Sequence, residues 1–159
     1  MPTEVERQQY RSVIGHFTTG VTVITGLGPD GPAGMTTNAV CSLSLEPVLL
    51  LVCFDNEART LPVVRESGRF AVNILRSDQD AIAEVFATKA HPNEKFDGVG
   101  YTVEHGVPLL HDTLAWLVCD LDRLIPGGDH TIGIGRVVAM HHDEGEPLVF
   151  YRGGYRGLD

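Results

Sequence analysis

The chain has 159 residues, and 12 Lys and Arg against 21 Asp and Glu give it a formal net charge of −9 at pH 7. This length fits one domain over residues 1–159 that buries roughly two-thirds of its unfolded surface. Because a net negative charge repels phosphate backbones and anionic lipids, we expect no binding to nucleic acid or to membrane surfaces.

The N-terminal half of the sequence predicts one helix followed by β-strands. Residues 4–15 carry apolar side chains at helical spacing among charges and end in Gly15, which is typical of a helix. Residues 20–25 and 33–41 are β-prone and are separated by a turn-forming segment at 28–32, so they predict a hairpin. The apolar run at 48–54 predicts a buried strand and is too short to span a bilayer.

The segment Gly26–Gly31 matches the pattern G-x-G-x-x-G, which binds dinucleotides when it follows a strand and opens a helix. Here Pro29 and Pro32 lead into another β-prone run instead. We therefore interpret these glycines as a hairpin turn. The common P-loop, nucleophile-elbow and H-E-x-x-H metalloprotease motifs are absent from the sequence.

The chain from residue 56 onward predicts further strands with two short helices. We expect helices over 56–68 and 81–88, the second preceded by a capping box at 77–80, and a long irregular connection over 89–112. Together with the hairpin, about seven strands joined mainly by turns favour an antiparallel barrel or sandwich over a doubly wound parallel sheet. The expected strands after residue 56 are 69–75, 114–124, 131–142 and 148–151.

The three cysteines and the histidine-rich tract predict neither disulfides nor a metal site. Cys41, Cys53 and Cys119 are odd in number, widely spaced and set among apolar residues, which is typical of reduced core thiols. The tract 141–144 reads as a solvated turn, because adjacent residues on a strand point to opposite faces. The first residues lack the charged-then-apolar pattern of a secretory signal, so we expect a cytoplasmic protein.

Three clusters carry the candidate chemistry. Residues 34–47 gather Thr, Ser and Asn without any Lys or Arg, which predicts weak, releasable binding of a polar cofactor through hydroxyls and backbone. Residues 126–131 are either a turn with a capping Asp or a site where His130 faces a ligand. Residues 150–157 are either a strand end with a loose tail or a place where Arg152 and Arg156 pair with phosphate and Tyr155 stacks on a flat ring.

Taken in order, six motifs of the chain resemble the flavin reductase-like family. They are Gly20–Thr25, Gly34–Ala39, Ser42–Pro47, Lys95-Phe96, Gly128–Thr131 and Tyr151–Tyr155. The resemblance implies a mainly β, antiparallel Greek-key split β-barrel with a few peripheral helices, known as the FMN-binding split barrel. It also implies a homodimer that reduces FMN or FAD with NADH or NADPH and supplies reduced flavin to a partner monooxygenase.

The resemblance assigns roles to individual residues. It implies that His130 is the catalytic residue that faces the nicotinamide and that Tyr155 lies near that face. Ala58 stands where the family often has Ser, so Arg59 or Thr60 would have to compensate for a missing phosphate contact. The flavin-binding residues that it implies are Thr36, Thr37, Asn38 and Ala39 along the isoalloxazine edge, Ser42, Leu43 and Ser44 beside the ribityl chain or phosphate, and Asn56, Arg59, Thr60, Lys95 and Phe96 closing the site.

Two other functions remain open on the sequence. One is a flavin-binding protein without independent turnover, and the other is a flavin-dependent oxidase or a heme-binding relative on the same barrel. The motif Gly128-Asp129-His130 favours the reductase, because a protein that only binds flavin needs no histidine facing a nicotinamide. The sequence does not distinguish FMN from FAD or NADH from NADPH.

Overall fold

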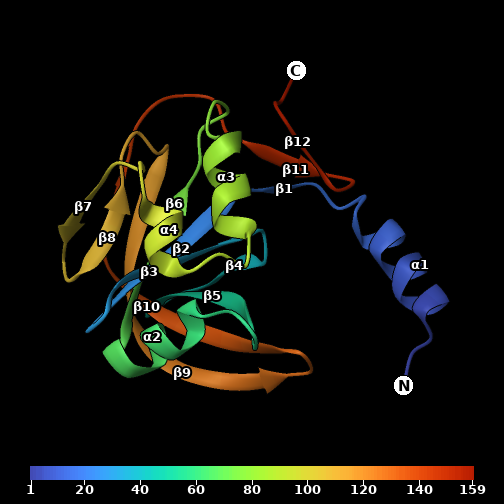
Figure 1. Cartoon of the computed structure of the whole chain (residues 1–159), viewed down its shortest axis with the longest axis horizontal. Helices are drawn as coiled ribbons and strands as arrows, with labels where there is room; N and C mark the ends of the chain where they lie inside the picture. The colour runs from blue at the N-terminus through green and yellow to red at the C-terminus, as the bar shows by residue number, and fades with distance from the viewer.

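The computed structural model describes residues 1–159 and consists of antiparallel strands with four helices (Figure 1). The helices are α1 (Glu4–Ile14), α2 (Thr60–Ser67), α3 (Asp80–Ala87) and α4 (Pro92–Phe96). The strands are β1 (Thr19–Gly20), β2 (Thr22–Gly28), β3 (Gly31–Thr37), β4 (Val40–Leu45), β5 (Val48–Asp55), β6 (Arg69–Ile74), β7 (Tyr101–Glu104), β8 (Val107–Leu110), β9 (Ala115–Gly127), β10 (His130–His142), β11 (Val149–Tyr151) and β12 (Gly154–Arg156).

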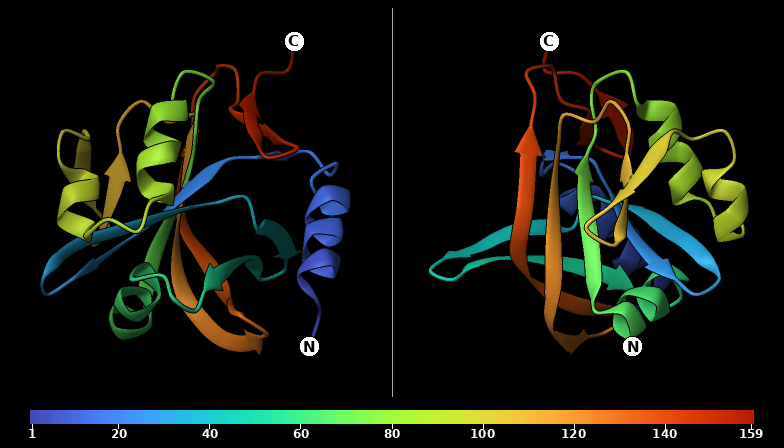
Figure 2. Two further views of the ribbon diagram at one scale, coloured as in Figure 1. Left: turned by 45° about the vertical axis from the view of Figure 1, so that its right-hand side comes forward. Right: turned by 90° about the vertical axis from the view of Figure 1, so that its left-hand side faces the viewer.

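The main sheet is rolled into a split barrel. Its seven strands follow the order β3-β2-β6-β9-β10-β5-β4, so β3 and β4 form its two opposite edges. Yet only Asn38 and Ala39 separate these strands in the chain, and three Cα–Cα steps span at most about 11 Å. The sheet must therefore curl until its edges approach, as Figure 2 shows. All strand pairings are antiparallel, which confirms the predicted fold class.

The barrel interior is packed around aromatic side chains. Phe54 and Phe70 are fully buried and meet edge to face, with 5.9 Å between their ring centroids. Gly135 lies against the Phe70 ring, because a Cβ at that position would come within 2.6 Å of the Phe70 Cζ. Burying each such side chain contributes roughly 1.5–3 kcal/mol, so the strands form a rigid frame for the residues at their ends. On β5 only every second residue is buried, although the run is uniformly apolar.

The connection 89–112 is not irregular, so this prediction is wrong. It contains α4 and the hairpin of β7 and β8, whose second strand is completely buried. Asn73 ties the hairpin to the main sheet: its Nδ2 donates to the Val23 carbonyl at 2.9 Å, and its Oδ1 accepts from the Leu110 amide at 3.0 Å. The Thr25 hydroxyl donates to the Pro108 carbonyl at 2.6 Å. Residues distant in sequence thus order this segment.

Three other expectations near the site need correction. The returning strand predicted over 33–41 ends at Thr37, and a new strand begins at Val40. The helix predicted over 56–68 begins at Thr60. The capping box at 77–80 is absent, because the N-cap residue of α3 is Gln79, whose side chain instead accepts from the Arg76 amide at 2.9 Å and donates to the His111 carbonyl at 3.1 Å.

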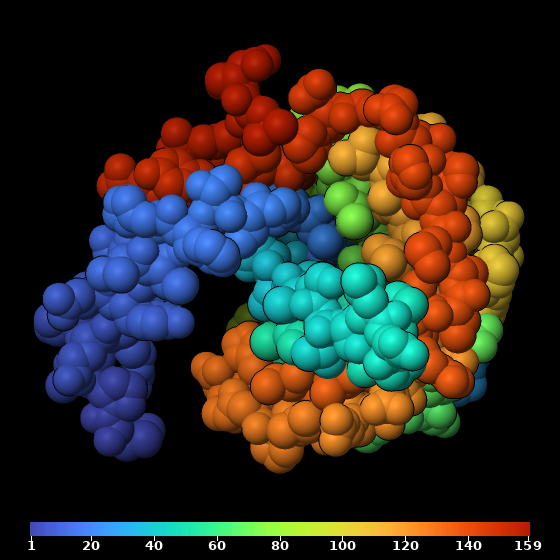
Figure 3. All heavy atoms as spheres, turned by 180° about the vertical axis from the view of Figure 1, so that it is seen from behind, coloured from blue at the N-terminus to red at the C-terminus, as the bar shows by residue number.

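The N-terminal helix projects from the barrel. The predicted helix is present as α1, capped by Thr3, but none of its residues is buried. Figure 3 shows it standing apart, with a hollow between it and the barrel. None of the helices is long and apolar enough to cross a membrane.

The C-terminal residues do not form a loose tail. Strand β12 pairs with β11, which also pairs with β1, and together they make a small three-stranded sheet. The Arg156 guanidinium lies over the Tyr151 ring, 5.1 Å from its centroid. This sheet carries the aromatic residues of the tail to the side of the molecule where α1 leaves the barrel (Figure 1).

Candidate functional site

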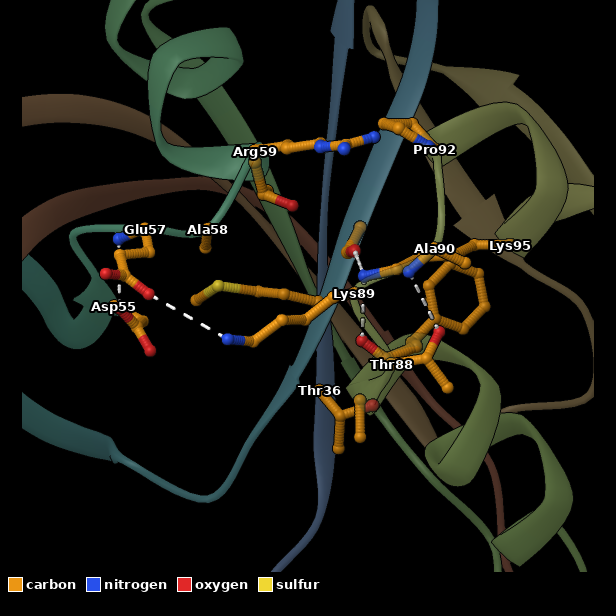
Figure 4. A pocket seen from close by; sticks show the side chains of 15 residues that line it. Thr36, Asp55, Glu57, Ala58, Arg59, Thr88, Lys89, Ala90, Pro92 and Lys95 are labelled. Carbon is orange, nitrogen blue, oxygen red and sulfur yellow. Dashed lines mark hydrogen bonds and ion pairs between the residues drawn. The ribbon is translucent and has the colours of Figure 1, made fainter.

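A cavity of about 310 Å³ lies between β3, the segment that leads into α2, and the helices α3 and α4 (Figure 4). Its volume is within the range of small-molecule sites in proteins. It is lined by Gly34, Met35, Thr36, Asp55, Glu57, Ala58, Arg59, Thr60, Phe86, Ala87, Thr88, Lys89, Ala90, Pro92 and Lys95.

Lys95 places a buried cation at this cavity. The residue is 9% exposed, and its ammonium group donates to the carbonyls of Gly34 at 3.2 Å and Phe86 at 3.1 Å. Burial, and secondly the nearby Arg59 guanidinium, lower the pKa of Lys95 below its usual value. An ammonium group has three donors, so one remains for a ligand. An anion bound here would compensate the buried charge and so reduce the free-energy cost of burying it.

The N-terminus of α2 faces the same cavity. Its N-cap residue is Arg59, which makes no side-chain capping bond, so the first backbone amides of the helix lack that partner. Thr60 is 2% exposed and lines the cavity, and its hydroxyl takes part in none of the side-chain hydrogen bonds of the structure. A helix N-terminus carries a partial positive charge. Together with the Arg59 guanidinium and the Lys95 ammonium, this arrangement suits a phosphate group.

Thr36 and an ion pair complete the walls and the rim. The Thr36 hydroxyl donates to the Ala83 carbonyl of α3 at 2.6 Å, which leaves its oxygen free to accept a hydrogen bond. At the mouth, the Lys89 ammonium and the Glu57 carboxylate lie 3.9 Å apart across the opening (Figure 4). Both side chains are largely exposed, and such pairs contribute about 0–1 kcal/mol. The rim can therefore open easily.

His130 lies beside this cavity and does not line it. It begins β10 and pairs in register with Asp55 of β5, which does line the cavity. Its Nδ1 is 2.7 Å from the Asp129 carboxylate. The hydrogen bond from His130 holds the pKa of the Asp129 carboxyl below its usual value. The ionised Asp129 therefore accepts from Nδ1–H and leaves Nε2 for another partner.

A second cavity of about 620 Å³ lies between α1 and the barrel. It is mainly apolar, and the link between β3 and β4 contributes Asn38 and Ala39 to it. The Thr19 hydroxyl oxygen is buried without a hydrogen-bond partner. Cys41 also lines it and is exposed, so it is not the core thiol that the sequence predicted. Its lining residues are Arg11, Ile14, Gly15, Phe17, Thr19, Asn38, Ala39, Val40, Cys41, Leu51, Cys53, Phe150 and Gly153.

The structure brings together only some of the residues that the resemblance assigns to flavin. Thr36, Arg59, Thr60 and Lys95 share the first cavity, and Phe96 packs behind it against Phe86, with 4.9 Å between ring centroids. Asn38 and Ala39 line the second cavity. The remaining predicted residues line neither cavity: Thr37, Ser42, Leu43, Ser44, Asn56, His130 and Tyr155.

Sequence reasoning missed Lys89 at the rim of the first cavity, whereas Glu57 lies within the segment 56–60 that was expected to close the site. Lys89 is a surface residue in a segment without a motif, so no local pattern indicates it. The prediction of a binding wall without cations also changes. Residues 34–36 do contribute neutral groups, but α4 and the start of α2 bring Lys95 and Arg59 to the same space.

Comparisons with known proteins agree with this architecture. A family model described as flavin reductase like domain matches residues 14–159. The chain is 38% identical over 159 residues to an NADH-dependent flavin reductase from Rhodococcus sp, covering 98% of this chain and 89% of that protein. It is 36% identical over 157 residues to HsaB, the reductase subunit of a flavin-dependent monooxygenase from Rhodococcus jostii strain RHA1, with 98% and 80% covered. The structure of the NADH:FAD oxidoreductase SgcE6 from Streptomyces globisporus C-1027 is similar, with a TM-score of 0.91, 35% identity, and 100% and 97% of the two chains covered.

Proposed function

The chain belongs to the flavin reductase-like domain family, and we propose that it is an NADH-dependent flavin reductase that supplies reduced flavin to a partner monooxygenase. The observation that carries the proposal is the convergence of Lys95, Arg59 and Thr60 on one cavity beside Thr36. They come from two separate elements, Arg59 and Thr60 from the start of α2 and Lys95 from α4, and they present donors to a common space, as binding of a phosphate-bearing cofactor requires.

The donor set fits the phosphate of a flavin nucleotide. Thr60 brings a hydroxyl that takes part in no side-chain hydrogen bond, α2 brings its N-terminal amides, and Lys95 brings the third ammonium donor. Charge-assisted hydrogen bonds contribute about 1.5–3 kcal/mol each. Asp55 and Glu57 also line the cavity and partly offset its three cations, Arg59, Lys89 and Lys95. This balance supports moderate affinity and release of the flavin as a product.

The chain's own residues would bind and orient the reactants. From the phosphate site, β3 leads through Thr36 and Thr37 to Asn38, and the polar groups of these residues would form hydrogen bonds along the flavin ring. The Ala39 amide already donates to the Thr37 hydroxyl, so Ala39 would contribute packing. When bound, flavin supplies the chemistry by accepting a hydride from the nicotinamide. The protein's part is to hold both rings at reacting distance and to exclude water. His130 would present Nε2 toward the nicotinamide, with Asp129 fixing its orientation.

A second copy of the chain is the partner that we propose for α1. The helix has eleven residues and no buried side chain, and isolated helices of this length are marginal in water. The second cavity separates it from the barrel and is mainly apolar. A homodimer would cover this surface. The exposed apolar side chains of the N-terminal region are Val5, Tyr10, Val13, Ile14 and Phe17.

The direct test is to mix the purified protein with NADH and either FMN or FAD and to follow the nicotinamide absorbance. We expect NADH oxidation that depends on added flavin. Binding of flavin without oxidation of NADH or NADPH would instead support the flavin-binding protein without turnover. Replacing His130 with Ala is expected to raise the KM for NADH more than the KM for flavin. An unchanged KM for NADH would remove His130 from the nicotinamide site.

A further inference from the structure

Asn56 is bound to the turn that carries His130. Its side-chain Oδ1 accepts from the Thr131 hydroxyl at 2.6 Å, and its Nδ2 donates to the Gly128 carbonyl at 3.3 Å. Its backbone amide donates to the Asp129 carbonyl at 3.1 Å. These three hydrogen bonds hold the residues on both sides of His130, and we call them the Asn56 clasp.

The clasp adds to the backbone pairing of this turn, in which Gly127 of β9 lies opposite His130 of β10. Gly128 has a φ of +68°, a conformation that glycine adopts without steric penalty. The Asp129 side chain is almost fully exposed, so the carboxylate that binds His130 is held by the turn alone. The hydrogen bonds to Gly128 and Thr131 enclose the pair Asp129 and His130 and limit how the turn can tilt.

The clasp also joins this turn to the phosphate-binding residues. Asn56 follows directly after β5, whose last residue, Asp55, pairs in register with His130. Three residues later the chain reaches Arg59 and then Thr60 at the start of α2. The segment that lines the cavity is therefore fastened at its beginning to the turn beside it. The sequence predicted that Asn56 closes the flavin site. Its polar atoms instead bind this turn, and the residue does not line the cavity.

We propose that Asn56 is a positioning residue for His130, which it holds at a fixed place relative to the Arg59–Thr60 segment. This inference rests on the proposed function, because it assigns the clasp to the geometry of the nicotinamide site. Removal of the Asn56 side chain leaves only the backbone hydrogen bond of the clasp and loosens the turn, so NADH binding weakens while the flavin phosphate site keeps its own donors. The effect of Asn56 passes through His130 and disappears when the imidazole is absent.

The test compares Asn56→Ala, Thr131→Val and Thr131→Ser with the wild type, each also in a His130→Ala background. Loss of two side-chain hydrogen bonds in Asn56→Ala is expected to raise the KM for NADH about tenfold, with kcat and the KM for FMN within about twofold. Thr131→Val is expected to show a smaller rise of about threefold. Thr131→Ser keeps the hydroxyl and should behave as the wild type. In the His130→Ala background, Asn56→Ala should add no further increase.

A second measurement reports on the clasp without turnover. In the protein without ligands, hydrogen exchange of the amides over 127–131 should be faster in Asn56→Ala and Thr131→Val, and unchanged in Thr131→Ser. Faster exchange with an unchanged KM for NADH would overturn the positioning role, as would an increase that persists without His130. A rise in the KM for FMN alone would return Asn56 to the flavin site. Wild-type protein that oxidises no NADH with either flavin would overturn the proposed function, whereas active wild type with unaltered Asn56→Ala kinetics would overturn only this inference.

Discussion

Replacement of Lys95 by Met is expected to weaken FMN binding while leaving riboflavin binding nearly unchanged. The two ligands differ only in the phosphate, which is the group that the Lys95 ammonium would contact. Lys95 is 9% exposed and already donates to two carbonyls, so its remaining donor is preorganised. Methionine has a similar length without the charge and fills the space that the lysine stem occupies.

The magnitude follows from one charge-assisted hydrogen bond. Such a bond contributes about 1.5–3 kcal/mol, and each 1.4 kcal/mol changes an equilibrium constant about tenfold. The Kd for FMN should therefore rise about 10- to 140-fold in Lys95→Met. The Kd for riboflavin should stay within about twofold, because riboflavin lacks the phosphate partner of this bond.

The assay is a titration of flavin fluorescence in the absence of NADH, with the melting temperature measured in the same buffer to detect loss of fold. Lys89→Met is the matched control, because Lys89 lines the same cavity but is 95% exposed. A surface charge of this kind contributes about 1 kcal/mol or less, so the Kd for FMN should rise less than about fivefold. An equal loss of FMN and riboflavin in Lys95→Met, or an unchanged Kd for FMN, would refute the assignment of Lys95 to the phosphate.

Three further predictions concern pH, packing and assembly. Burial lowers the pKa of Lys95 below the usual lysine value. FMN affinity should therefore be highest at pH values below this pKa and should fall as the pH rises through it, whereas riboflavin affinity should not change. Between this lowered pKa and the ordinary lysine pKa of the unfolded chain, the unfolded state binds more protons than the folded state. The free energy of unfolding should therefore rise with pH over this range, and denaturant titrations at several pH values measure it. Gly34→Ala would place a Cβ 2.8 Å from the buried Phe86 ring, so urea unfolding should show a loss of about 1–3 kcal/mol, whereas Gly20→Ala, with nothing within 4 Å, should show little change. Ile14→Glu should shift sedimentation from dimer to monomer, and an unaltered dimer would contradict the role proposed for α1.

The strands that sequence reasoning identified are those with strong local patterns. The apolar run of β5 and the many β-branched and large apolar residues of β9 and β10 favour strands locally, so their conformation depends little on distant residues. In the hairpin of β7 and β8, the β-prone run 101–103 is short, and Gly98, Gly100, Gly106 and Pro108 around it favour a loop. The hairpin is ordered by Asn73 and Thr25, which lie far away in the sequence. Single-sequence reasoning has no means of seeing such contacts.

In the candidate site as well, sequence reasoning identified some features, whereas others depend on contacts that only the fold creates. Motif resemblance selected Thr36, Arg59, Thr60 and Lys95, and the structure places all four on one cavity. Resemblance also assigned Asn56 to flavin, but the structure turns its polar atoms to the residues around His130. A motif shows which residue types occur together, whereas the direction of a side chain depends on which neighbours the fold supplies.

The link between β3 and β4 limits how this protein can evolve. Within four residues the chain passes from Thr36 in the first cavity to Asn38 and Ala39 in the second. A substitution here that changes the proposed contacts with the flavin ring would also alter the surface that faces α1, so each change would affect two properties at once. The rim near Lys89 is free of this coupling, because its side chain is exposed and its only ion-pair partner is Glu57. Adaptation to a new flavin should therefore proceed faster at the rim than along β3.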